Sequence, residues 1–176
     1  MYEFLGPGFA IWHELQAVAQ GPLRRRRLHR QLHRMLYLEA VANLEVLTAL
    51  KRSEGFERLA VDSPAFAWAV RQLSTKALET VLLGDWEHFG AVGPLAEQVA
   101  EENDDDSAGD LRTPYLVMRY LAMKIAFLRS VLDGGVGLPV ANMNVPLRIK
   151  RIHAHYVQLV QSLAQMPEVA PFVVKR

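Results

Sequence analysis

Apolar residues along this chain recur at helical spacing, and glycine and proline divide them into separate segments. Between Gly21-Pro22 and Gly55 neither residue occurs, and the apolar stretch between them predicts one long helix over residues 23–52. Ser63-Pro64 and Thr113-Pro114 are typical helix starts, with the hydroxyl residue as N-cap and proline in the first turn. The pattern therefore predicts a chain built from helices.

Four main helices are expected, and they cover residues 23–52, 64–83, 115–132 and 146–165. Short helices are expected within residues 1–22, as an N-terminal accessory element, and between residues 85 and 102. No segment alternates apolar and polar residues for long enough to predict a strand. The sequence thus predicts an all-α fold, a single domain over residues 1–176. We expect an antiparallel helical bundle of four main helices plus one or two short helices.

Charge is distributed unevenly along the chain, although the formal net charge is only +1. Residues 1–52 carry a net charge of +4, residues 53–110 of −10 and residues 111–176 of +7. Within the acidic part, residues 103–110 contain no large apolar side chain, and we expect them to form a mobile loop.

The basic charge near the N-terminus is concentrated in one short cluster, formed by Arg24, Arg25, Arg26, Arg27, Arg30 and Arg34. Two interpretations stay open. The acidic segment can neutralise these arginines within the fold, or they can bind an anionic partner. Such a partner is a nucleic acid, an acidic protein or an anionic membrane surface.

Several classes of chemistry have no matching motif in the 176 residues. The chain lacks cysteine, which excludes disulfides, thiolate metal sites and a cysteine nucleophile. It has no phosphate-binding glycine loop, no HExxH pair and no Glu-x-x-His pair of the di-iron bundles. We therefore expect no metal and no cofactor. Absence of cysteine, of a signal segment and of an 18-residue apolar run predicts a location in the cytoplasm, or peripherally at a membrane.

Glu39 and Asn43 are two polar residues in the most apolar part of the long predicted helix. They are four positions apart and therefore share one face. A buried carboxylate needs a partner, so we expect Glu39 to meet an arginine or lysine of another helix, with Arg119 and Arg129 as the candidates. The alternative is a polar patch that lines a groove between helices. Trp68 is expected to be a core aromatic residue.

The last helix carries the one arrangement that suggests catalysis, Arg148, His153, His155 and Tyr156. An arginine followed after four to six residues by a histidine resembles the motif of the HEPN nucleases, which are all-α bundles. The resemblance implies a ribonuclease in which the histidine acts as general acid or base and the arginine stabilises the phosphorane. It covers about nine residues, and Ile149 stands where the family usually has a polar residue.

Two further contacts are predicted from apolar surface. Residues 4–27 combine an apolar segment with the arginine cluster, a combination that suits peripheral membrane contact. Residues 36–50 are apolar on more sides than a simple four-helix packing uses, which predicts a homo-oligomer contact around Ala42.

These observations favour a non-enzymatic helical-bundle interaction or scaffold protein that docks onto protein partners through charged surfaces. One alternative is a metal-independent ribonuclease that uses Arg148 and His153. Another is an RNA- or DNA-binding protein that uses the arginines of residues 24–34, and a third is a peripheral membrane protein.

Overall fold

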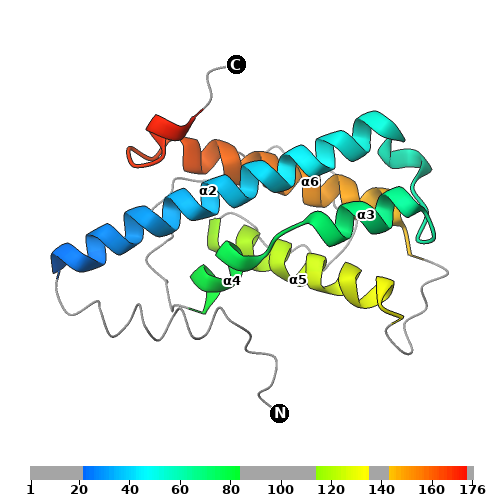
Figure 1. The fold of residues 1–176 in the computed structure, drawn as a ribbon, viewed down its shortest axis with the longest axis horizontal. Helices are drawn as coiled ribbons and strands as arrows, with labels where there is room; N and C mark the ends of the chain where they lie inside the picture. Colours follow the sequence, from blue (N-terminus) through cyan, green and yellow to red (C-terminus); the bar gives the residue numbers. More distant parts are fainter. Residues whose placement is uncertain (1–21, 84–113, 135–142, 174–176) are drawn as a thin grey trace, which may run out of the picture.

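The computed structural model describes residues 22–83, 114–134 and 143–173, and the side chains of residues 22–26 and 114–115 lie outside the description. Its elements are α2 (Pro22–Ser53), η1 (Phe56–Arg58), α3 (Pro64–Gln72), α4 (Lys76–Leu82), α5 (Pro114–Leu132), α6 (Val145–Ala164) and η5 (Ala170–Phe172) (Figure 1). Every regular element in these ranges is a helix, so the predicted all-α fold is confirmed. The accessory element of residues 1–22, the short helices of residues 85–102 and the loop of residues 103–110 fall outside the described ranges.

The long helix α2 lies alongside α6 in antiparallel orientation (Figure 1). Contacts between the two helices show this direction, because Asn43 meets Tyr156 near the middle while Phe56 meets His153 beyond the end of α2. Residue numbers thus rise along α2 as they fall along α6. The predicted antiparallel bundle is therefore the arrangement observed.

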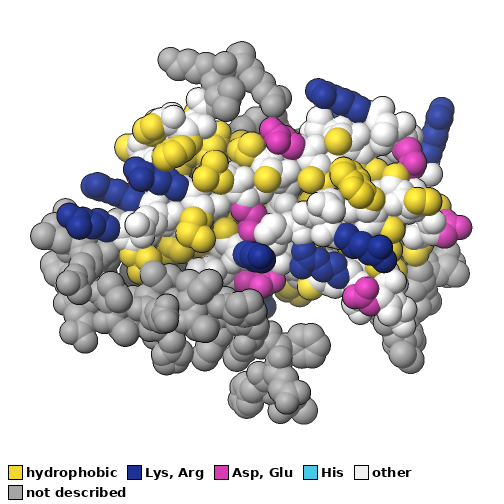
Figure 2. Space-filling model, in the orientation of Figure 1, with side chains coloured by type: hydrophobic (Ala, Val, Ile, Leu, Met, Phe, Trp, Pro, Cys, Tyr) yellow, Lys and Arg dark blue, Asp and Glu magenta, His cyan; other side chains and the backbone are white. Residues whose placement is uncertain are grey.

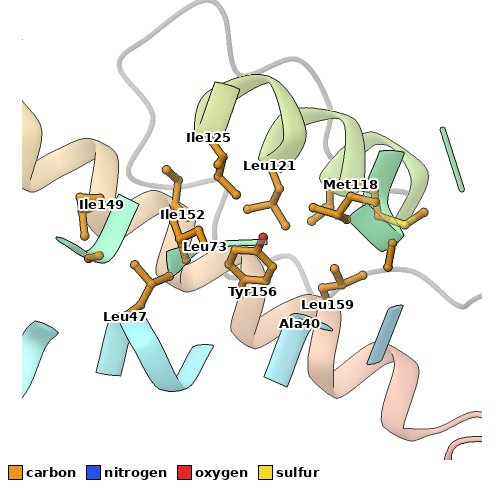
Figure 3. Packing of buried hydrophobic residues seen from close by; sticks show 14 of the residues in the cluster. Ala40, Leu47, Leu73, Met118, Leu121, Ile125, Ile149, Ile152, Tyr156 and Leu159 are labelled. Carbon is orange, nitrogen blue, oxygen red and sulfur yellow. The ribbon is translucent and has the colours of Figure 1, made fainter. Parts of the chain in front are cut away.

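The core lies where α2, α5 and α6 meet, and Tyr156 is at its centre (Figure 3). Its ring is fully buried, with Leu121 of α5 on one side and Leu47 and Ala40 of α2 on the other (Figure 3). Each large apolar side chain buried in this way contributes roughly 1.5–3 kcal/mol relative to exposure. None of the described helices has the length and apolar character that crossing a bilayer requires.

Helix ends follow the capping signals in the sequence. Ser63 accepts a hydrogen bond from the backbone N–H of Phe66 at 3.4 Å, as its predicted N-cap position requires. Asn144 caps α6 in the same way, through the N–H of Leu147 at 3.0 Å. Gly134 follows α5 with a φ of 74°, a left-handed conformation that glycine adopts without strain.

The helix predicted over residues 64–83 is wrong, because the structure has two helices there. The helix is interrupted between α3 and α4 at residues 73–75, although none of these residues is glycine or proline. We call residues 73–75 the break. Glu39 of α2 holds the break open by accepting hydrogen bonds from Ser74 Oγ at 2.6 Å and from the N–H groups of Ala77 and Leu78 at 2.9 and 3.1 Å. A carboxylate at the first turn satisfies N–H groups that have no partner inside α4 and favours the positive end of its dipole.

Asn43, one helical turn further along α2, binds the same break from its other side. Its amide accepts from Ser74 N–H at 2.8 Å and donates to Ser74 O at 2.7 Å and to the Tyr156 hydroxyl at 2.7 Å. Arg129 of α5 completes the group by donating to Leu73 O and, at 3.1 Å, to Thr75 Oγ1. Hydrogen bonds thus join α2 and α5 to the break, and Tyr156 of α6 is joined to it through Asn43.

We call Glu39, Asn43, Ser74, Arg129 and Tyr156 the α3–α4 network. The expected ion pair between Glu39 and Arg119 or Arg129 is absent from the described residues. Glu39 binds the start of α4 instead, and Arg129 reaches the adjacent carbonyl. The sequence expectation was therefore wrong in the partner of Glu39, although Arg129 enters the same network.

Trp68 is also placed differently from the prediction. It lies on α3 with 48% of its surface exposed, while its neighbours Phe66, Ala69 and Val70 are fully buried. The side of this short helix that faces the core is narrow. Phe66, Ala69 and Val70 occupy it, and Trp68 lies on the solvent-facing side.

Replacing Asn43 with alanine is expected to lower the free energy of unfolding by about 2–4 kcal/mol, because Ser74 and Tyr156 then lose their buried partners. Tyr156→Phe removes a single hydrogen bond and is expected to cost about 1 kcal/mol. Urea denaturation of both variants, with Gln161→Ala at an exposed site of α6 as control, measures the difference. Equal losses for all three variants would contradict the network.

Candidate functional site

Two of the four candidate catalytic residues on α6 lie inside the bundle. Tyr156 is fully buried, and this burial raises the pKa of its hydroxyl well above the ordinary value. His155 is 4% exposed, and its ring lies edge-on to Tyr120 of α5 with centroids 4.7 Å apart. Its Nδ1 lies 3.2 Å from Gln158 Oε1. Both side chains therefore contribute to helix packing.

The other two residues, Arg148 and His153, face different neighbours. The Arg148 guanidinium lies 5.1 Å from the centre of the Phe127 ring on α5. The half-buried His153 packs edge-on against Phe56 of η1, with ring centroids 5.5 Å apart. General acid–base catalysis needs both groups within reach of one reacting phosphate. In the described structure their contacts direct them toward separate elements.

His155 is the histidine that shares a side of α6 with Arg148, because both contact α5. The two residues are seven positions apart, a separation of about 10 Å along the helix. The described residues contain no group of three histidine or acidic side chains that is placed to bind a metal ion.

A turn after α6 folds back onto the N-terminal half of α2. Glu168 in this turn pairs with His33 through its carboxylate, and its backbone oxygen accepts from Arg34 Nε at 3.0 Å. Arg34 also lies over the ring of Phe172, 5.2 Å from its centre, and the neighbouring Val169 is fully buried. This C-terminal turn therefore engages Arg34, one member of the arginine cluster, in contacts within the fold.

Glu168 was not singled out in the sequence, although one signal was available. It is the one acidic residue after Asp133, in a segment rich in basic residues. Desolvation raises the pKa of its carboxyl, but a backbone hydrogen bond, the hydrogen bond and charge of His33 and the charge of Arg30 together lower this pKa below its ordinary value. The isolated position of Glu168 among basic residues is thus the sequence feature that could have indicated its pairing within the fold.

The arginine cluster is only partly available for binding. Arg27 and Arg30 are exposed, and we call these two residues the basic surface. Arg34 is half-buried under the C-terminal turn. Dark-blue side chains over the N-terminal half of α2 mark this region in Figure 2. The side chains of Arg24, Arg25 and Arg26 fall outside the description.

Three of the buried or half-buried histidines, His33, His153 and His155, are expected to make the fold less stable in acid. Burial is the largest effect on His33, His153 and His155, and it lowers the pKa of each below the ordinary value of about 6.5. The unfolded chain therefore binds more protons than the folded chain just below pH 6.5, and the free energy of unfolding falls as the pH falls.

Urea denaturation between about pH 7.5 and about pH 5.5 measures this slope. His155→Gln removes one of the titrating groups, so the loss on acidification is expected to be smaller than in the unaltered protein. A free energy of unfolding that rises on acidification would contradict this description.

Comparison with known proteins adds no relative to this description. The chain matches no family model, and neither the curated proteins nor the solved structures give a significant match. The contacts and surfaces of the chain itself therefore carry the information about its function.

Proposed function

We propose that this protein is a non-enzymatic interaction module that docks an acidic protein segment onto the basic surface of α2. The observation that supports it most is the contrast between the two groups of candidate residues. Those on α6 are engaged in packing, whereas Arg27 and Arg30 are exposed on a rigid helix. A cytoplasmic location, favoured by the absence of cysteine, belongs to the same proposal.

The geometry of the basic surface fits two closely spaced carboxylates. Arg27 and Arg30 are three positions apart, so their side chains are neighbours on one side of α2. Arginine binds carboxylates through two parallel hydrogen bonds, which suits an acidic segment with closely spaced Asp or Glu residues. The partly exposed ring of Phe172 beside Arg34 offers such a segment an apolar contact.

A polyglutamate peptide is the direct probe of this surface. Binding is expected to weaken between about 50 mM and about 300 mM salt, because exposed charges are screened. Arg27→Glu/Arg30→Glu should weaken binding about tenfold or more, since each exposed charge pair is worth up to about 1 kcal/mol. Fluorescence anisotropy of a labelled peptide measures both effects.

Arg71→Glu/Arg119→Glu is the matched control, because it changes charge equally at exposed arginines of α3 and α5. An equal loss with this control would contradict a specific site on α2. Parallel assays with RNA and anionic vesicles distinguish the other functional classes. Tighter binding to single-stranded RNA or to anionic vesicles favours those partners, and RNA cleavage that His153→Ala abolishes establishes the nuclease alternative.

A further inference from the structure

The outward side of α2 carries a stripe of exposed residues with heptad spacing. Met35, Leu38, Ala42, Glu45 and Ala49 are exposed and separated by alternating steps of three and four positions, and we call them the α2 stripe. Leu38 is 53% exposed and Met35 49%. A repeat of 3.5 residues is the spacing with which one helix packs along another.

The stripe is more apolar than the outward side of α5. The exposed positions along the middle of α5 are Arg119, Met123, Ala126 and Ser130, with one large apolar residue among them. On the α2 stripe, four of five residues are apolar and Glu45 is the one charged member. Yellow side chains follow the middle of α2 in Figure 2. A contiguous apolar surface of this kind marks a protein contact.

The central pair of residues in the stripe is complementary in size when the stripe is turned through a two-fold axis. Leu38 and Ala42 lie at equal distances from residue 40, on either side of it. Two antiparallel copies of α2 that cross at this position place the large Leu38 of each copy against the small Ala42 of the other. Because a two-fold axis repeats each contact, the Leu38–Ala42 contact occurs twice in the dimer.

The charges match under the same operation. Glu45 lies five positions after residue 40 and Arg34 six positions before it, on the same flank of α2. The antiparallel crossing therefore places Glu45 of each copy opposite Met35 of the other and beside the neighbouring Arg34. Arg34 has donors beyond the Nε that binds the carbonyl of Glu168, so both interactions are possible together. An acidic partner would instead meet Glu45 with like charge.

We propose that two copies of this chain form a dimer by packing their α2 stripes in antiparallel orientation about residue 40. This interface is separate from the basic surface, so either proposal can fail without the other. In the dimer the basic surfaces of the two copies lie at opposite ends of the paired helices.

The dimer is expected to have twice the chain mass of 19.8 kDa, and Ala42→Glu is expected to halve it. The new carboxylate would lie against Leu38 of the second copy, in the dry centre of the contact. Ala126→Glu, at an exposed alanine of α5, should keep the dimer mass. Sedimentation equilibrium measures the masses, and circular dichroism verifies that each variant remains helical.

Three results would overturn the proposal: a monomeric unaltered protein at concentrations of roughly 100 μM and above, a dimeric and helical Ala42→Glu, or a monomeric Ala126→Glu. Failure of polyglutamate binding, in contrast, leaves these masses unchanged.

Single cysteines test the orientation, because the chain has none of its own. Leu38→Cys and Ala42→Cys, mixed and oxidised, are expected to form a mixed disulfide faster than either variant alone, since residue 38 of one copy faces residue 42 of the other. Faster cross-linking of each variant with itself would indicate parallel helices and overturn the antiparallel arrangement. Ala126→Cys should remain uncross-linked.

Discussion

The rest of the fold depends on the contact of Glu39 and Asn43 with the break between α3 and α4. Both side chains project from the inner side of α2 and satisfy backbone groups of residues 74, 77 and 78. Leaving these polar groups without partners in the interior would cost several kcal/mol. This requirement fixes the rotation of α2 about its own axis, because Glu39 and Asn43 must both face residues 74–78.

This fixed rotation decides which residues of α2 face outward. With Asn43 directed toward Tyr156 and Leu47 toward the core, Leu38, Ala42 and Ala49 are left on the opposite side. The C-terminal turn adds a second constraint at the basic end, where Glu168 holds His33 and Arg34. The polar network inside and the apolar stripe outside are therefore two consequences of one helix orientation.

Much of this arrangement could be predicted from the sequence, because glycine, proline and N-cap residues mark most helix ends locally. The break at residues 73–75 could not, since its cause lies on α2, more than 30 positions away. The spatial arrangement of the candidate catalytic residues on α6 could not be predicted from the sequence for the same reason. Their spacing is visible in the sequence, but whether Arg148 and His153 converge depends on Phe127 and Phe56, which other elements supply.

An antiparallel α2 pair would turn one basic surface into two, held apart by a rigid helix pair, which is the geometry of a bivalent scaffold. Inter-copy distances between spin labels at Arg27→Cys test this directly. The account predicts labelled sites about 40 Å apart, at about 1.5 Å of rise per residue on either side of residue 40. A separation of about 10 Å would indicate parallel helices. Either this short distance or the absence of any coupling between labels would contradict the antiparallel dimer.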